Sequence, residues 1–600
     1  MKEDINANNK CGKLLKKETI CLAKDVRLRK ELWGGIVFRR DNGTVVDVDQ
    51  DAFTLLSLLE EKHAVKVEDL LAVFSGKDKG KKSAVKHRND TVAVLQQLFD
   101  LGIVKVCRLQ EAAPAEHAIY DTVGKPAAKP ENSPGLTPSP QRQNDNCSLS
   151  APETVHWAIT FRCLQDCPDC YARRYREQGF DELQTDKALQ VVKNLAGWGV
   201  FQLALGGGEP LLRPDLPLIT RAAKDSGLAV HITTGLIEDF DFELLEQLAP
   251  SIESLHIGVK RDRLLNQPRQ EMAHLQQIVH VAQTLGLATG ANLILCNTVM
   301  KNFGEIIEDL VKAGFKRIIL LRYKPPSDVN LWLAETPPPE AFINFETILQ
   351  ETVKLYPHIE FRLDCALSFL QRNLSPGEAL SAGLRGCVAG SRVMALAADG
   401  SIYPCSQLMS PRFKAGDILS EDFRSFWNAK PMKKYRYFRE KRSFRETYCG
   451  ICQARKQCGG CRVFAHDALG EDPGCRKPLF PPVQQLGREG RKAALRAYFE
   501  KHFSISVGEY MDYFQVGQKK AVKELKNTSW LMQEKAESSG RKKADTYIRT
   551  DAYLLEEIQE VIGFTSGGFP YATLEEISRW VNEPEDLHDY PKWLLSRQQD

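Results

Sequence analysis

The segment Ile159–Tyr171 reads ITFRCLQDCPDCY, and its cysteines have the spacing C-x3-C-x2-C at Cys163, Cys167 and Cys170. Three thiolates can hold three irons of a [4Fe–4S] cluster and leave the fourth iron without a protein ligand. An open iron can bind a small chelating molecule, whereas a cluster held by four cysteines mainly passes electrons. The spacing therefore predicts a ligand-binding cluster. A zinc site is the alternative, although zinc sites more often contain paired C-x2-C units or histidine.

A second motif, GGGEP at Gly206–Pro210, comes directly after the apolar run Phe201–Leu205. Together the two motifs resemble the radical S-adenosylmethionine (SAM) superfamily. The resemblance implies a catalytic cluster whose open iron chelates the amino and carboxylate groups of SAM. It also implies that the methionine amino group contacts the turn at Gly207, Gly208, Glu209 and Pro210. One departure is Asp169, because the family usually has an aromatic residue before the third cysteine.

Residues 153–375 alternate short apolar runs with helical stretches, which predicts an α/β fold with a parallel sheet and crossover helices. The expected strands are Val155–Thr160, Phe201–Leu205, Ala229–Thr233, Ser254–Val259, Ala288–Leu295 and Arg317–Leu321. The clearest expected helices are Thr185–Trp198, Asp215–Ser226, Gln270–Leu285 and Phe303–Ala313. Such units form a partial (β/α)6 barrel, in which chemistry lies at the carboxyl ends of the strands. Both motifs follow strands and are therefore expected on that rim.

Other polar residues are expected near the same rim. Thr234 ends the third strand, and Asn292 lies on the fifth, so both are candidate contacts of SAM. Asn297 and Arg322 can touch SAM or substrate, or they can be satisfied polar residues of the barrel rim. After the fourth strand, Lys260 stands where relatives usually have a different polar residue, so no ribose contact is transferred there.

A second group of cysteines lies between residues 387 and 475. Its order, C-x12-G-x4-C, then C-x2-C-x5-C-x2-C, then C, resembles the SPASM extension of radical SAM enzymes. The resemblance implies one auxiliary [4Fe–4S] cluster on Cys449, Cys452, Cys458 and Cys475. It also implies that Cys387, Cys405 and Cys461 provide three of the four ligands of a second auxiliary cluster. The fourth ligand of that cluster is either Cys365 or a residue other than cysteine, or the position is vacant. For all seven cysteines together, a pair of zinc ribbons is the alternative.

Residues 17–107 show a β-then-α pattern. The expected strands are Leu22–Arg27, Gly35–Phe38 and Val45–Val48, with a hairpin turn at Asn42-Gly43, and the helices are Asp51–Glu61, Lys66–Phe74 and Asn89–Leu101. The pattern resembles the RiPP recognition element, a winged-helix domain similar to the pyrroloquinoline quinone peptide chaperone. The resemblance implies that a leader peptide adds to the strand Val45–Val48 and rests on the helix Asn89–Leu101. A DNA-binding winged helix that uses the basic run Lys77–Arg88 is the alternative.

The remaining segments complete the organisation. Residues 108–152 are rich in proline, alanine and serine and predict a linker that separates the first domain from a complete catalytic core. Residues 376–480 form the expected SPASM domain. Residues 485–600 predict a helical extension of unknown role, with amphipathic stretches at Ala493–His502, Lys519–Lys526 and Ala552–Ile562.

Composition limits the choice of function. The chain has 600 residues, 43% hydrophobic residues and a net charge of +3, which does not favour nucleic acid as a partner. No apolar stretch has the length of a membrane span, and the first residues lack the apolar region of a secretory signal. In a large chain of this kind most of the 16 cysteines are expected to bind metals rather than form disulfides, and a reducing cytoplasm suits oxygen-sensitive clusters. Cys11, Cys21, Cys107 and Cys147 are expected to have no special role, and Cys296 is expected to be a buried thiol.

The leading hypothesis is a radical SAM enzyme that modifies a ribosomally synthesised precursor peptide through a 5′-deoxyadenosyl radical. Its expected partners are the precursor and a reductant such as flavodoxin or ferredoxin. The alternatives are an enzyme of the haem-pathway or sulfatase-maturation type, which acts on a small molecule or a folded protein, and an iron–sulfur regulator that binds DNA. The sequence does not tell which residue is modified, which bond forms or what the oligomeric state is.

Overall fold

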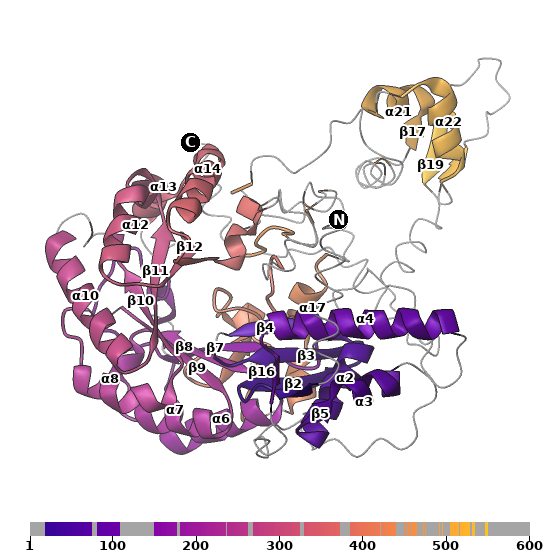
Figure 1. Ribbon diagram of the computed structural model, residues 1–600. Helices are drawn as coiled ribbons and strands as arrows, with labels where there is room; N and C mark the ends of the chain where they lie inside the picture. The colour runs from indigo at the N-terminus through magenta and orange to yellow at the C-terminus, as the bar shows by residue number, and fades with distance from the viewer. Residues whose placement is uncertain are drawn as a thin grey trace.

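The computed structural model describes residues 18–74, 81–107, 149–371 and 385–464 with short gaps, and parts of 472–549. Its largest element is a ten-stranded sheet in the order β13-β12-β11-β10-β9-β8-β7-β14-β15-β16. Figure 1 shows the barrel strands of this sheet in magenta, with helices along their outer side and the indigo N-terminal domain beside them. The expected linker falls almost wholly outside the described residues.

Six consecutive parallel strands form the partial barrel that the sequence predicts. They are β7 (Thr154–Thr160), β8 (Gln202–Gly207), β9 (Ala229–Thr234), β10 (Ser254–Val259), β11 (Ala288–Leu295) and β12 (Arg317–Arg322). The crossover helices are α6 (Thr185–Gly197), α7 (Leu216–Asp225), α8 (Phe242–Leu248), α10 (Pro268–Thr284) and α12 (Phe303–Lys312). Alternate residues of β7 pack under these helices, and Val155, Trp157 and Ile159 are almost fully buried.

The sheet continues beyond the barrel at both ends, which the sequence did not indicate. A seventh parallel strand, β13 (Glu360–Leu363), pairs with β12 and leads directly into the 3-10 helix η3 (Cys365–Gln371). At the other end, β14 (Val393–Leu396) runs parallel to β7 and forms a hairpin with β15 (Ser401–Tyr403), which pairs with β16 (Gly416–Asp417). Cys387 and Cys405 of the second group therefore flank strands that extend the barrel sheet.

The N-terminal domain contains two small antiparallel sheets. One has the order β2-β3-β4, from β2 (Val26–Glu31), β3 (Gly34–Arg39) and β4 (Thr44–Asp49). The other joins β1 (Thr19–Leu22) to β5 (Val65–Lys66) and β6 (Val104–Val106). The single strand expected at Leu22–Arg27 is therefore wrong, because the chain turns there between β1 and β2.

Three helices complete the domain: α2 (Gln50–Lys62), α3 (Val67–Phe74) and α4 (Lys81–Asp100). The basic run from residue 81 onward is helical rather than a loop, since α4 begins two turns earlier than its apolar stripe indicates. Asn42 of the expected hairpin turn lies outside the described residues, whereas Gly43 has the positive φ of 71° that such a turn requires.

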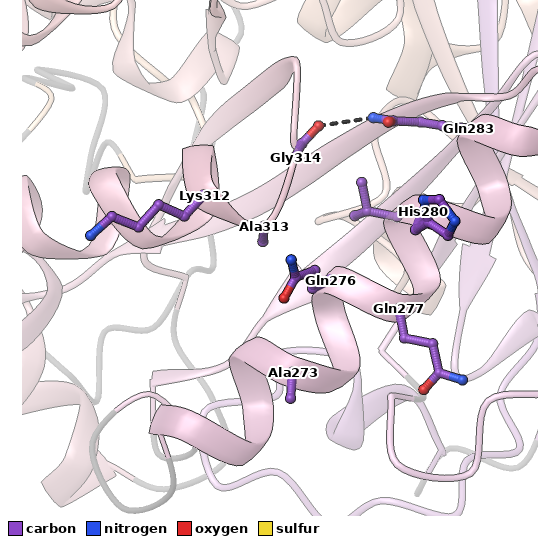
Figure 2. A pocket seen from close by; sticks show the side chains of 9 residues that line it. Ala273, Gln276, Gln277, His280, Gln283, Lys312, Ala313 and Gly314 are labelled. Carbon is purple, nitrogen blue, oxygen red and sulfur yellow. Dashed lines mark hydrogen bonds between the residues drawn. The ribbon is translucent and has the colours of Figure 1, made fainter.

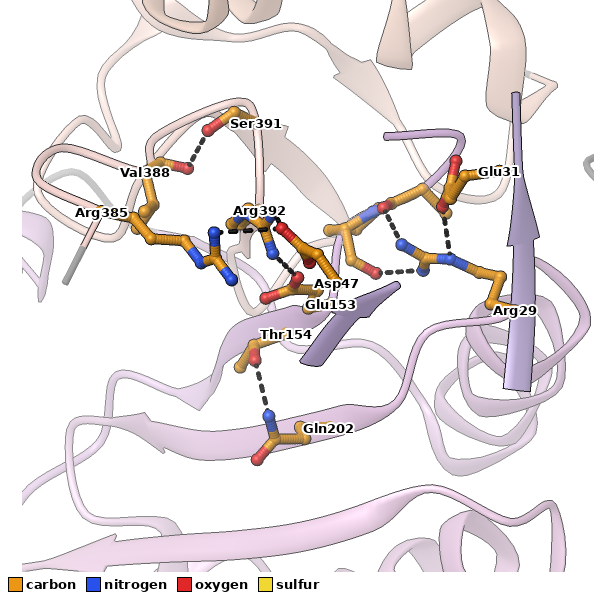
Figure 3. Close-up of polar contacts among 12 residues, drawn as sticks. Arg29, Glu31, Asp47, Glu153, Thr154, Gln202, Arg385, Val388, Ser391 and Arg392 are labelled. Atoms are coloured by element: carbon orange, nitrogen blue, oxygen red, sulfur yellow. Dashed lines mark hydrogen bonds and ion pairs between the residues drawn. The ribbon is translucent and has the colours of Figure 1, made fainter. Parts of the chain in front are cut away.

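The N-terminal domain is docked on the barrel through buried polar contacts (Figure 3). The Arg29 guanidinium, 1% exposed, donates to Glu31 and to the carbonyl oxygens of Ala151, Pro152 and Gly199. Phe38 of β3 stacks on Phe201 with ring centroids 5.2 Å apart. The two bodies therefore share an interface as well as a chain connection.

The C-terminal part contains a small sheet that the sequence did not indicate. Strands β17 (Ser504–Ser506), β19 (Thr546–Arg549) and β18 (Leu531–Gln533) pair in that order beside α21 (Val507–Phe514) and α22 (Gln518–Lys526). The predicted helix Lys519–Lys526 coincides with α22. The expected helix at Ala552–Ile562 and nearly all of Ala493–His502 lie outside the described residues.

Candidate active site

The first cysteine motif forms the loop that follows β7. Cys163, Cys167 and Cys170 are partly buried, and the Cys170 amide donates to the Cys167 carbonyl at 3.2 Å. The short helix α5 (Arg173–Arg176) comes next, and the Arg173 guanidinium donates to the same carbonyl oxygen. The loop thus stands at the carboxyl end of a barrel strand, where the sequence places it.

The glycine turn after β8 touches the backbone of that loop. The amides of Gly208 and Glu209 donate to the carbonyl oxygens of Thr160 and Arg162, each at 2.8 Å. A Cβ atom at Gly208 would lie 2.2 Å from the Arg162 oxygen, a distance that real side chains do not reach. Glycine is needed here because only it allows two backbone segments to approach this closely.

Gly208→Ala is therefore expected to displace the cysteine loop and to weaken SAM binding at least about tenfold, or ~1.4 kcal/mol. Isothermal titration of SAM into the anaerobic protein measures the dissociation constant. Gly206→Ala is the matched control, because nothing lies within 4 Å of a Cβ at that position. Equal SAM affinities of the two variants would show that the close approach at Gly208 has no role in the site.

Glu209 joins the ends of two strands. Its side chain is 2% exposed, and it accepts hydrogen bonds from the Leu211 amide at 3.1 Å, the Thr234 hydroxyl at 3.0 Å and the Gly235 amide at 2.9 Å. The predicted contacts Glu209 and Thr234 thus bind each other and fix the turn against the end of β9. Pro210 begins the 3-10 helix η1 (Pro210–Leu212) immediately after this carboxylate. Direct contact of these residues with SAM stays a prediction.

Lys260, at the end of β10, places a cation next to the cysteine loop. The pKa of the Cys167 thiol is raised by burial, and the Lys260 ammonium acts against that rise. The ammonium nitrogen is buried, and no oxygen or nitrogen atom of the described residues accepts a hydrogen bond from it. A buried cation without an oxygen partner suits an anionic group such as the carboxylate of SAM.

A second lysine lies between the cysteine loop and the second group of cysteines. The Lys324 ammonium is 3.1 Å from the Asp364 carboxylate and 5.7 Å from the centre of the Tyr171 ring. Burial opposes its charge, but Asp364 holds the pKa of Lys324 above its ordinary value. Burial likewise opposes ionisation of Asp364, yet Lys324 keeps the pKa of that carboxyl low. The pair is therefore ionised beside both groups of cysteines.

Beneath the rim, the barrel interior holds neutral histidines. Ser254 bridges His231 and His256 at 2.8 Å and 2.9 Å. Burial lowers the pKa of His231 to about 4 and that of His256 to about 3. Asn292, a predicted SAM contact, lies within this group beside the His256 ring.

The other rim residues have structural roles. Asn297 donates to the carbonyl oxygens of Ala334 and Thr336. Arg322 points toward the second cysteine group, where its guanidinium donates to Asp472 Oδ2 at 2.8 Å and lies 3.9 Å from the centre of the Phe464 ring. Both therefore match the alternative that they are satisfied polar residues of the barrel.

The later cysteines gather in two sets. The thiol of Cys458 interacts electrostatically with those of Cys449 and Cys475, and Cys449 interacts with Cys452. Burial raises the pKa of both Cys449 and Cys458. No three His, Cys, Asp or Glu side chains in the described part of the chain stand close enough to hold a single metal ion. The cysteines of a cluster lie farther apart than the ligands of one ion, because they surround a body of iron and sulfide.

Asp472 links the two sets and was not found from the sequence. Its carboxylate, fully buried, accepts from the Cys461 amide at 2.7 Å and the Gly474 amide at 2.9 Å, and it pairs with Arg322. The motif Asp-Pro-Gly-Cys carried the only signal, since its aspartate precedes a predicted ligand. Thiolates repel a nearby carboxylate, so the Arg322 cation is needed to balance the charge.

A surface hollow lies away from this site (Figure 2). It is lined by one face of α10, including Gln276 and His280, and by the turn after α12. Gln283 of α10 joins the two elements, because its Nε2 atom donates to the carbonyl oxygen of Gly314 in that turn at 2.8 Å. None of the predicted site residues lines it. The chemistry of the chain therefore belongs to the rim rather than to this hollow.

Comparisons with known proteins agree with the two cysteine groups. Residues 157–262 match the family model described as the radical SAM superfamily. Residues 387–459 match the model of SPASM, an iron–sulfur cluster-binding domain. No helix in the described part of the chain is long and apolar enough to cross a membrane.

Three similar proteins illustrate the relationship. An AdoMet-dependent heme synthase of Methanosarcina barkeri is 25% identical over 364 residues, 54% of this chain and 97% of that protein. A PqqA peptide cyclase of Methylobacterium nodulans is 25% identical over 356 residues, 56% of this chain and 90% of that protein. The crystal structure of Streptococcus suis SuiB bound to S-adenosylmethionine has a TM-score of 0.52 and 16% identity, and covers 76% of this chain and 98% of SuiB. The likeness to SuiB concerns the fold.

Proposed function

On the premise that this chain carries a radical SAM domain followed by a SPASM domain, we propose that it modifies a ribosomally synthesised precursor peptide. The radical SAM domain binds a [4Fe–4S] cluster and SAM, and the SPASM domain binds auxiliary iron–sulfur clusters. The peptide assignment is carried by the N-terminal domain, in which β4 pairs only with β3 among the described strands. Similarity to a PqqA peptide cyclase, whose name states a peptide substrate, supports it.

The residues of the rim fit the cofactor. Cys163, Cys167 and Cys170 would hold the cluster, which with bound SAM supplies reductive cleavage and a 5′-deoxyadenosyl radical. Gly208 and Glu209 fix the loop that carries these ligands, and the buried Lys260 ammonium attracts the carboxylate of SAM. Lys324 and Asp364 form an ion pair next to Tyr171 of the cysteine loop, and in the proposed reaction this pair orients a substrate. The main contribution of the protein is positioning, because the cofactor carries the difficult chemistry.

Leader recognition is assigned to β4. Among the described strands β4 pairs only with β3, so its outer edge leaves backbone groups for an added strand. In β-augmentation such an edge gives affinity through main-chain hydrogen bonds, and side-chain contacts give specificity. Val46 of β4 and Val92 of α4 are half-buried. Both pack against the domain core and offer apolar surface for a leader. We propose that this winged-helix domain is a RiPP recognition element.

Val46→Glu is expected to weaken leader binding about tenfold or more, because it introduces a charge into an apolar contact. The assay is fluorescence anisotropy of a labelled peptide with the leader sequence encoded beside the gene. Val73→Glu is the control, since Val73 lies on α3 and is 61% exposed. If both variants keep their helical circular dichroism and bind the leader equally, β4 is not the recognition strand.

A porphyrin is the second candidate substrate, because the heme synthase of M. barkeri aligns over nearly its whole length. The two substrates can be compared directly. Anaerobic protein is incubated with SAM and dithionite, alone, with the neighbouring precursor peptide, or with a porphyrin, and 5′-deoxyadenosine formation is followed. Peptide-dependent turnover with a mass change of the peptide supports the proposal. A response only to porphyrin would contradict it.

The remaining partners follow from the cofactors. The clusters need one-electron reduction, for which a flavodoxin or ferredoxin is the suitable class of donor. Oxygen-sensitive clusters are compatible with a reducing cytoplasm, where we place the protein. A DNA-binding role is not favoured, since a sensor has no need for the glycine turn that contacts the cysteine loop.

A further inference from the structure

We propose that Cys365 is the fourth protein ligand of the first auxiliary cluster, together with Cys387, Cys405 and Cys461, so that this cluster has no open iron. The inference rests on the proposed function only in assuming that auxiliary clusters form. The SPASM match begins at residue 387 and does not include Cys365, which belongs to the barrel part of the chain. Four observations carry the assignment.

The sheet brings Cys365 to the second cysteine group. Cys365 directly follows β13, the strand at one end of the ten-stranded sheet. Cys387 and Cys405 lie before and after the β14–β15 hairpin, near the other end. The sheet curves into a partial barrel, and Cys365 comes near Cys387 and Cys405 although β13 and β14 are far apart in the strand order. A cluster held from both ends would join the barrel to its extension.

A hydrogen-bonded bridge fixes the two backbones that carry Cys365 and Cys461. The Arg322 guanidinium donates to the Ala366 carbonyl at 3.2 Å and to Asp472 Oδ2 at 2.8 Å. The same carboxylate oxygen accepts the Cys461 amide at 2.7 Å. The side chains of Arg322 and Asp472 are 7% and 0% exposed, so the bridge is shielded from water. It places the residue after Cys365 near Cys461.

Packing agrees with the bridge. Ala366, Cys387 and Cys461 belong to one buried cluster, against which Cys405 is partly buried. The Cys365 thiol interacts electrostatically with the thiols of Cys461, Cys387 and Cys405. Its side chain nevertheless retains accessible surface, unlike a structural cysteine that fills a core. Cys365 therefore lies near the other three cysteines without being sealed into the core.

The neighbouring carboxylate is not the better ligand. Asp364 is 3.1 Å from the Lys324 ammonium and accepts the Ala366 amide at 3.2 Å. This ion pair would have to break before the carboxylate could bind iron. Cys365 would lose only the weak hydrogen bond between its thiol and Asp364. Thiolate is also the usual ligand of [4Fe–4S] clusters. A cluster with four cysteines transfers electrons and does not bind the substrate through iron.

The test uses full-length protein in which Cys163, Cys167 and Cys170 are all alanine, so that only auxiliary clusters contribute. After anaerobic reconstitution we expect about eight irons and no [3Fe–4S] signal in electron paramagnetic resonance after mild ferricyanide oxidation. Adding Cys365→Ala should give that signal and a loss of about one iron, because an iron without a protein ligand is released first. Cys296→Ala in the same background is the control and should match the parent.

Two further measurements keep the test decisive if Cys365→Ala folds poorly. Cys365→Ser should retain about eight irons but shift the reduction potential of one auxiliary cluster, since an oxygen ligand replaces sulfur. Added cyanide should leave the spectrum of the parent unchanged. A parent that binds cyanide, or that forms a [3Fe–4S] cluster, would overturn the inference. If Cys365→Ala matches the parent at about eight irons, while the enzyme that retains Cys163, Cys167 and Cys170 still modifies the peptide, only the inference fails. Absence of auxiliary iron would overturn the inference and the auxiliary part of the proposed function together.

Discussion

Replacing Cys163, Cys167 and Cys170 together by alanine is expected to abolish SAM cleavage and to remove about four of roughly twelve irons. The reason is that these three thiolates are the proposed protein ligands of the cluster that binds SAM, and no other cysteine is predicted to replace them. Iron analysis and chromatography of 5′-deoxyadenosine after dithionite reduction measure the two effects. The auxiliary clusters should remain, since their ligands lie between residues 365 and 475.

A matched control replaces three cysteines outside the predicted clusters. Cys21 and Cys296 are buried, and Cys107 ends the N-terminal domain. The triple alanine variant at these positions should keep all the iron and cleave SAM normally. Protein that contains stoichiometric zinc and no iron would contradict the whole assignment. Equal loss of iron in both triple variants would show that the loop after β7 is not the specific site.

The barrel could be predicted because its signals are local. Each strand is a short apolar run, and each helix carries its own apolar stripe, so Ser254–Val259 and Ala288–Leu295 were predicted with the bounds that the structure has. The spacing of Cys163, Cys167 and Cys170 is local as well. The position of Gly206–Pro210 after a strand placed the second motif on the same rim.

Contacts between distant residues could not be predicted in this way. The sequence motif predicts that Glu209 contacts SAM. The hydrogen bonds of Glu209 with Thr234 and Gly235, however, depend on how β8 and β9 pair. Asp472 and Arg322 are 150 positions apart, and neither has a pattern that names its partner. Cys365 was only one of several options for the fourth ligand, because sequence spacing does not show that the residue after β13 approaches Cys387, Cys405 and Cys461.

The docking of the N-terminal domain changes one expectation. The proline-rich segment predicts a separable domain and a complete catalytic core without it. In the structure, β3 packs Ile36 and Phe38 against Phe201 and Ala229. Asp47 of β4 pairs with Arg385 and Arg392 on the two sides of Cys387, and Arg392 also pairs with Glu153 (Figure 3). Deleting residues 1–110 would expose this apolar surface and leave buried charges unpaired, so the truncated chain is not a clean test of leader binding.

Arg29→Met tests the interface without truncation and is expected to destabilise docking by about 3–5 kcal/mol. Methionine keeps the bulk but removes the donors to three carbonyl oxygens and leaves the Glu31 carboxylate buried without its cation. Burial already raises the pKa of Glu31, and Arg29 acts against that rise. Hydrogen exchange followed by mass spectrometry should show faster exchange of the amides in β2–β4 and at residues 149–152.

Arg40→Met is the control for the loss of a charge at the same interface. Arg40 pairs with Glu253, but their side chains are 23% and 25% exposed, so water can replace the lost partner and the cost should be about 1 kcal/mol or less. Arg29→Lys should recover part of the protection, since an ammonium keeps the charge but cannot donate in all the directions of a guanidinium. If Arg29→Met exchanges as slowly as Arg40→Met, the domain is held by its apolar face and the Arg29 contacts are incidental.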